Sequence, residues 1–158
     1  MRPLRLLAEE GEHWVMKGSV RLRDVDGIVI VLFASRVRLA PDIDAWYAAL
    51  ERRGVRATMC LAPGPIRTES AQRRQTVEVL RRVEIPATVI TDHRFNRGLI
   101  RTFGYLGVSM QLYGWAQLDE AARALASRPG KAEEIAKTAR VLRREAERRS
   151  NISGVLGS

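Results

Sequence analysis

The sequence predicts an α/β domain with a mixed, largely parallel β-sheet and helices packed on it. Runs of apolar and β-branched residues, typical of strands covered on both faces, alternate with segments whose apolar residues recur at helical spacing. Such alternation indicates parallel strands joined by right-handed connections. The chain has 158 residues, 46% of them hydrophobic and 28% charged, which suits one globular core.

The first elements are predicted to be a hairpin arm and a central strand. Residues 13–23 partly alternate apolar and polar side chains, as a half-exposed edge strand or hairpin arm does. The pair Asp26-Gly27 follows as a turn. Residues 28–34 then form an unbroken apolar run, which indicates a strand at the centre of the sheet.

A helix is predicted over residues 41–54. Pro41 suits its first turn, and Gly54 follows two arginines at its end. The same strand–helix rhythm then continues to residue 126. It places strands at 56–62, 87–91 and 108–112, and helices at 69–83, 94–105 and 118–126.

The C-terminal part is predicted to be an appended basic helix. Arg128-Pro129-Gly130 breaks the rhythm, and the next residues carry a thin apolar stripe among arginines and glutamates. The stripe has two candidate partners, the parent sheet and a second copy of the chain. We expect an N-terminal arm at 1–12, a domain at 13–127, the appended helix at 128–149 and a tail at 150–158, with the stripe formed by Ile135, Ala139, Leu142 and Ala146.

The chain is strongly basic, with 27 Lys and Arg against 18 Asp and Glu and a formal net charge of +9. Such a surplus attracts nucleic acid, anionic lipid or an acidic protein surface. Because no nucleic-acid-binding motif accompanies the charge, a solvated surface is favoured over nucleic-acid binding. No apolar run is long enough for a transmembrane helix, and a single cysteine offers no disulfide framework, so we expect a cytoplasmic protein.

Several chemical motifs come close to a match and fail. Cys60 and Arg67 are separated by six residues, one more than in the phosphate loop of cysteine phosphatases, and two prolines remove amide donors between them. Cys60 is therefore expected to be buried and inert. His13 and His93 lack the spacing of zinc ligands, and no nucleotide-binding glycine pattern is present. We predict no catalytic residue, no cofactor and no metal.

The stretch from residue 85 to 126 resembles a known family. A strand ending in Thr91-Asp92 leads into a helix, and a final strand precedes the segment Leu118-Asp119-Glu120-Ala121. This order, with the hairpin before it, is similar to the SpoIIAA-like, or STAS/SEC14-type, domain over residues 13–127. The resemblance implies a STAS fold and a role in binding. At the strand end, Thr91 or Asp92 is expected to cap the next helix.

The sequence departs from the family pattern at the regulatory serine. In STAS anti-sigma-factor antagonists, that serine follows an aspartate and opens a helix, whereas residues 61–70 contain no Asp-Ser pair. Thr68 and Ser70 lie in the matching neighbourhood. One of them is expected to serve as the helix N-cap. Phosphorylation of either residue is the alternative, because Arg67 and the helix dipole would stabilise the added charge.

The region from residue 94 to 115 is the predicted partner-binding face. It holds five of the nine aromatic residues of the chain, flanked by arginines, a combination enriched at protein interfaces. We therefore expect a non-enzymatic regulatory or scaffold module that binds a protein partner or a second copy of itself. The alternatives are a phospho-regulated switch and an anionic-lipid-binding module. The predicted contact residues are Arg94, Arg97, Arg101, Phe103, Tyr105, Tyr113 and Trp115.

Overall fold

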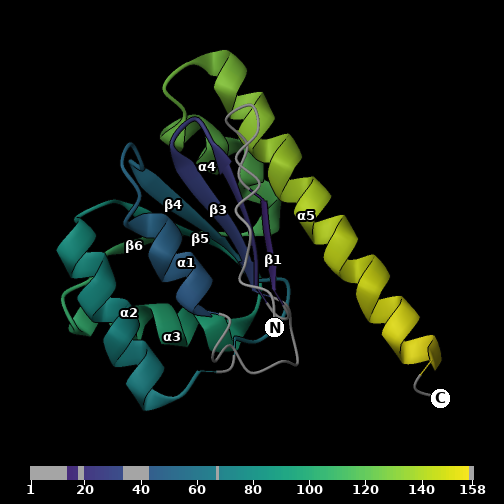
Figure 1. Ribbon diagram of the computed structural model, residues 1–158, viewed down its shortest axis with the longest axis horizontal. Coiled ribbons are helices and arrows are strands. Elements are labelled where there is room, and N and C mark those ends of the chain that lie inside the picture. Colours follow the sequence, from purple (N-terminus) through teal and green to yellow (C-terminus); the bar gives the residue numbers. More distant parts are fainter. Residues whose placement is uncertain (1–13, 18–19, 34–42, 67, 157–158) are drawn as a thin grey trace.

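The structure, a computed structural model, describes residues 14–17, 20–33, 43–66 and 68–156. It shows one β-sheet with helices on both faces (Figure 1). Three helices cover one face of the sheet, called here the front, and two cover the back. The α/β class predicted from the sequence is confirmed.

The sheet has six strands that lie side by side in chain order. Both pairings within the first three strands are antiparallel, and the three pairings that follow are parallel. Parallel neighbours need a helical crossover, which explains why a helix separates each of the later strands. The strands are β1 (Trp14–Lys17), β2 (Val20–Val25), β3 (Ile28–Phe33), β4 (Ala57–Leu61), β5 (Ala87–Ile90) and β6 (Met110–Tyr113).

Three crossover helices pack on the front face of the sheet. They bury apolar side chains against alternate residues of the central strands, such as Val31, Cys60 and Val89. The remaining residues of these strands face the back, because successive side chains of a strand point to opposite faces. The front helices are α1 (Ile43–Leu50), α2 (Ser70–Val83) and α3 (Arg94–Tyr105).

The back face is covered by α4 (Leu118–Leu125), which follows the short helix η2 (Trp115–Gln117), and by α5 (Pro129–Leu156). Ile135, Ala139 and Leu142 are fully or almost fully buried, on a helix that packs against β2, β3 and α4. The apolar stripe of the appended helix therefore packs on the parent sheet, and a second copy is not needed to cover it. Figure 1 shows α5 running along the back of the sheet and on past its edge.

Two boundaries differ from the sequence prediction. The single arm expected over residues 13–23 is two strands, β1 and the start of β2, and the predicted Asp26-Gly27 turn joins β2 to β3. The backbone of α5 remains helical to Leu156, where a tail was expected from residue 150. No proline occurs at residues 150–156 to interrupt the backbone hydrogen bonds, and the small and polar side chains there do not end the helix.

Candidate partner-binding surface

Helix α3 is held on the sheet by one face. Its buried residues, Asn96, Ile100 and Phe103, recur at intervals of four and three, as the inner face of a helix requires. The helix begins at His93, whose ring Nδ1 accepts a hydrogen bond from the backbone amide of Phe95 at 3.2 Å. The prediction that Thr91 or Asp92 caps this helix is therefore wrong.

Both residues have other partners. The Thr91 hydroxyl accepts from the His93 amide at 3.2 Å, and an Asp92 carboxylate oxygen accepts from the Trp115 amide at 3.1 Å. A Cβ at Gly114 would lie 2.8 Å from that same oxygen, so the absence of a side chain there leaves room for the contact. The Asp92 bond joins the segment after β5 to the start of η2, which follows β6.

Asn96 fastens α3 to the loop that follows β4. Its Oδ1 accepts from the Ile66 amide at 2.8 Å, and its Nδ2 donates to the Gly64 carbonyl at 2.8 Å and to Thr91 Oγ1 at 3.0 Å. The side chain is fully buried, and such groups are stable only with their hydrogen bonds made. This carboxyl end of the strands is where open α/β sheets bind ligands, and here its polar groups bond to one another.

The sequence did not single out Asn96. The signal was available, because an amide side chain occupies a position that the helical period assigns to the buried face of α3. A polar residue at such a position needs partners from the protein. Asn96 thus sets the angle at which α3 leaves the sheet and presents its outer face.

The outer face of α3 carries Arg94, Arg97 and Arg101. All three are exposed and recur at intervals of three and four, so they form one row along the helix. Among the described residues, none of their guanidinium groups makes an ion pair or a hydrogen bond. Residues 94–105 also include no aspartate or glutamate. Within the described part of the chain, the row is therefore a positive surface without compensating charge.

Two aromatic rings accompany the arginine row. Tyr105 is 91% exposed and Phe95 is 57% exposed, values that are unusual for large rings in a packed domain. Leu106, directly after α3, and Leu112, on the neighbouring strand β6, are also exposed. We call Arg94, Phe95, Arg97, Arg101 and Tyr105 the α3 surface.

The other predicted contact residues lie elsewhere. Phe103 is only 5% exposed and belongs to the front core, so it supports α3 from below. Tyr113 and Trp115 pack against the back core, and the Trp115 ring lies under the Arg143 guanidinium, 4.2 Å from its centroid. The sequence interval 94–115 is thus divided between the two faces of the sheet, and its exposed part is the α3 surface.

Thr68 and Ser70 do not cap α2. The N-cap is Glu69, whose backbone amide donates to Gln72 Oε1 at 3.2 Å. The hydroxyls of Thr68 and Ser70 instead accept from the Arg73 guanidinium, at 3.2 and 3.0 Å. The prediction that Thr68 or Ser70 caps the helix is therefore wrong, because α2 begins at Ser70 and the cap position falls on the residue before it. Arg67, invoked for both the phosphate loop and phosphorylation, lies outside the described residues.

Cys60 is buried in β4, as expected. Burial raises the pKa of its thiol to about 12, and a hydrogen bond with Thr58 opposes this only in part. Because the thiolate is the reactive form of cysteine, the buried thiol has little nucleophilic character near neutral pH.

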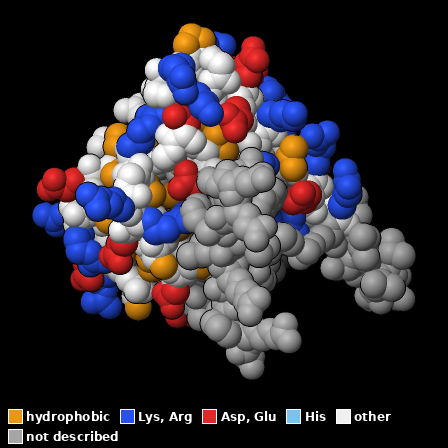
Figure 2. Space-filling model, turned by 45° about the horizontal axis from the view of Figure 1, so that its top comes forward, with side chains coloured by type: hydrophobic (Ala, Val, Ile, Leu, Met, Phe, Trp, Pro, Cys, Tyr) orange, Lys and Arg blue, Asp and Glu red, His pale blue; other side chains and the backbone are white. Residues whose placement is uncertain are grey.

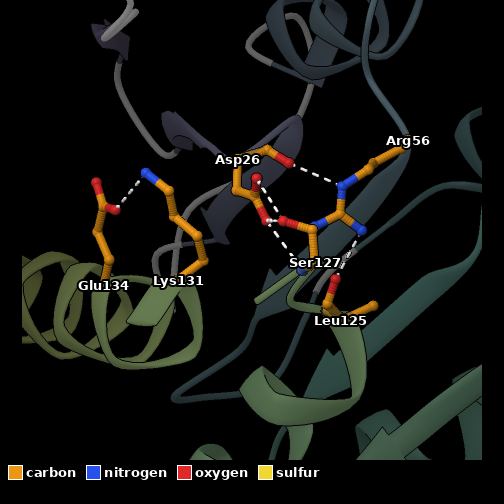
Figure 3. Close-up of polar contacts among 6 residues, drawn as sticks. All are labelled: Asp26, Arg56, Leu125, Ser127, Lys131 and Glu134. Carbon is orange, nitrogen blue, oxygen red and sulfur yellow. Dashed lines mark hydrogen bonds and ion pairs between the residues drawn. The ribbon is translucent and has the colours of Figure 1, made fainter. Parts of the chain in front are cut away.

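A second polar cluster lies at the opposite end of the parallel strands (Figure 3). Arg56 Nη2 donates to Asp26 Oδ2 at 2.6 Å, its Nε to the Asp26 carbonyl at 2.8 Å and its Nη1 to the Leu125 carbonyl at 2.7 Å. The Ser127 hydroxyl and amide also donate to the Asp26 carboxylate. The cluster ties the β2–β3 turn to the linker between α4 and α5.

The Asp26 cluster escaped sequence reasoning because its members are far apart in the chain. Asp26 and Gly27 both have positive φ, as a two-residue hairpin turn requires. Partial burial alone would raise the pKa of the Asp26 carboxyl. Hydrogen bonds from Ser127 and Arg56 outweigh that effect and lower it from 3.8 to about 2. The cluster fits a structural clamp.

The remaining predictions concern surface charge, metal binding and membrane spanning. Figure 2 shows Lys and Arg side chains over much of one face, with Asp and Glu side chains between them. In the described part of the chain, no three metal-ligating side chains gather as a metal site would require. No described helix combines the length and apolar character needed to cross a membrane.

Comparisons with known proteins identify no relative: no family model, no curated protein and no solved structure matches the chain.

Proposed function

We propose that the chain is a non-enzymatic docking module that binds a protein partner through the α3 surface. The observation that carries the proposal is the row of three exposed arginines without a charged or hydrogen-bonding partner among the described residues, next to two exposed aromatic rings. Arginine and aromatic side chains dominate binding energy at protein interfaces. A regulatory or scaffolding role follows from such docking.

Affinity capture from an extract of the source organism tests the proposal. The wild-type chain is compared with Arg97→Glu/Arg101→Glu and with the control Arg74→Glu/Arg81→Glu. The control arginines are also exposed and unpaired among the described residues, lie seven residues apart on α2, and undergo the same change of charge. We expect a protein that the wild type and the control retain and the α3 variant loses. Equal retention by both variants would contradict docking at this surface.

Phospho-regulation at Thr68 or Ser70 is a second candidate function. It is favoured by Arg73, whose guanidinium already contacts both hydroxyls and would pair with a phosphate on either one. Mass spectrometry of the chain purified from its source, with Arg73→Ala in parallel, tests the idea. Phosphate on Thr68 or Ser70 that alters partner capture is the expected result, whereas unmodified protein under all growth conditions would remove this candidate.

Binding to anionic lipid receives less support. An amphipathic helix inserts its apolar face into the membrane, and the apolar stripe of α5 is covered by the sheet. Up to Arg148, the basic side chains of α5 are interspersed with glutamates. Sedimentation with anionic vesicles at low salt tests this alternative, and we expect the chain to stay in the supernatant.

We further propose that the domain is of the STAS, SpoIIAA-like type. Support comes from a hairpin leading into four parallel strands in chain order, with a helix after each of them. A crystal structure of the chain tests this assignment. Superposition on a SpoIIAA-like domain should align all of β3 to α4, and a different strand order would contradict it.

A further inference from the structure

Strand β6 forms an open edge of the sheet. It pairs with β5 on one side, and no described strand pairs with its other side. The Tyr113 carbonyl accepts from the Thr91 amide at 2.9 Å, so the peptide groups of Tyr113 point toward β5. In a parallel ladder, alternate residues point to opposite sides. The amide and carbonyl of Met110 and Leu112 therefore face outward.

Apart from its short length, the β6 edge lacks the features that normally block strand pairing. Natural edge strands are protected by short length, charged side chains, proline or a bulge. The four residues Met110–Tyr113 contain no charge and no proline, and they pair with β5 in continuous register. Gln111 and Leu112 are exposed, with Leu112 38% exposed. The edge is accessible to an additional strand.

Arg97 and Arg101 lie on the flank of α3 nearest this edge. Side chains turn by about 100° per residue around a helix, so the Arg97 side chain is rotated about a quarter turn from the buried face of α3. Because the connection from β5 through α3 to β6 is right-handed, this rotation directs Arg97 toward β6. Arg101 is rotated slightly farther from the buried face, toward solvent. Leu99 falls on the opposite flank, in agreement with its packing against the front core.

The spacing of the two arginines matches that of a strand. Four residues of helix span about 6 Å, and two residues of strand span about 6.6 Å. Leu112 aligns with Val89 and thus points to the front, the side on which α3 lies. A strand added beside β6 would present every second side chain to that same side. Acidic residues at alternate positions would therefore meet Arg97 and Arg101.

Other occupants fit this edge less well. Two copies of the chain paired through β6 would bring two arginine rows together, on molecules that each carry a net charge of +9. A nucleic acid would satisfy the arginines but has no peptide groups for the outward amides and carbonyls of β6. An acidic peptide in extended conformation satisfies both.

We propose that β6 accepts an extended acidic segment of a partner protein as a seventh strand, with carboxylates at alternate positions paired to Arg97 and Arg101. This inference rests on the proposed docking function and specifies its ligand. Backbone hydrogen bonds to Met110 and Leu112 supply affinity, and the two arginines supply specificity, as in other cases of strand addition to a sheet edge.

Selection from a display library of random ten-residue peptides tests the inference on the full chain. We expect enrichment of peptides with Asp or Glu at alternate positions. The best peptide, made synthetically, should bind at least tenfold more weakly to Arg97→Glu/Arg101→Glu and equally well to Arg74→Glu/Arg81→Glu. No enrichment, or enriched peptides without alternating acidic residues, would overturn the proposal.

The strand geometry is tested without altering the protein. Two versions of the selected peptide are compared, one methylated at its odd-numbered and one at its even-numbered backbone amides. Only one of the two should lose binding, because a strand at an edge uses every second peptide group. Hydrogen exchange at the Met110 and Leu112 amides should slow when the peptide binds. A peptide that binds through the arginines with no protection at these amides would refute strand addition while leaving docking at the α3 surface intact. Equal retention of the partner by the α3 variant and the control in the capture experiment would refute docking itself.

Discussion

Helices α3 and α5 are both rich in arginine, yet they use it differently. On α5, Arg140 pairs with Asp119 of α4 at 2.8 Å, and Arg143 contacts both Glu147 and the Trp115 ring. On α3, the arginine row has no partner among the described residues. The comparison shows that a basic sequence does not by itself mark a binding site. What matters is whether the fold supplies the opposite charge.

The first test of this contrast is the packing of α5. Ile135 is fully buried between α5 and the back of the sheet. Ile135→Ala should lower the free energy of unfolding by about 2–5 kcal/mol, because it removes buried methyl groups and leaves a cavity. Urea denaturation followed by circular dichroism measures the change. A loss below about 0.5 kcal/mol would mean that α5 does not pack on the sheet in solution.

The clamp at the start of α5 should have the next largest effect. Asp26→Asn removes a charged acceptor from hydrogen bonds with Ser127 and Arg56, which should cost about 1–3 kcal/mol of unfolding free energy. Ser127→Ala, which keeps the ion pair, is the milder control. If the two variants are equally stable, the ion pair between Asp26 and Arg56 contributes nothing measurable.

The same carboxylate predicts a pH dependence. The pKa of Asp26 in the folded chain is about 2, below its ordinary 3.8, so the folded state favours the ionised form. The stabilisation is fully present above pH 3.8 and is lost as the pH falls toward 2. Over this window, wild type should lose more stability than Asp26→Asn. Parallel curves for the two proteins would contradict the lowered pKa.

The stacking of Arg143 on Trp115 should contribute less. Arg143→Ala should lower the unfolding free energy by about 0.5–1 kcal/mol, the range of cation–π contacts at partly exposed sites. Arg143→Lys retains the charge but stacks less well on the ring, and we expect an intermediate value. Thermal unfolding of the three proteins separates them. A larger loss for the lysine variant than for alanine would argue against the stacked geometry.

The α3 row should show the smallest effect on stability. Arg97→Glu/Arg101→Glu should change the unfolding free energy by no more than about 0.5 kcal/mol, because no described contact is lost. The measurement is the same urea titration, at low and at high salt. A clear destabilisation that salt does not relieve would mean that these arginines serve the fold, and the contrast with α5 would disappear.

Much of the fold could be read from local sequence. The unbroken apolar run at β3 and the helical spacing of Trp46 and Leu50 in α1 depend only on side chains close in the chain, so these elements were predicted within a few residues. The N-cap residues were not predicted, since His93 and Glu69 become caps only because of where α3 and α2 begin. The bonds from Asn96 to Ile66 and Gly64 and the Asp26 clamp join residues 30 or more positions apart, beyond the reach of periodicity.

For this chain, the sequence by itself determined the α/β class, the burial of Cys60 and the presence of arginines at helical spacing on α3, because each follows from the order of neighbouring residues. Only the tertiary structure decided which arginines remain available. It placed Asp119 beside Arg140, turned Tyr113 and Trp115 to the back of the sheet, and left the α3 surface next to an open strand. Charge pairing depends on distance in space, and distance in space is set by the packing of the whole domain.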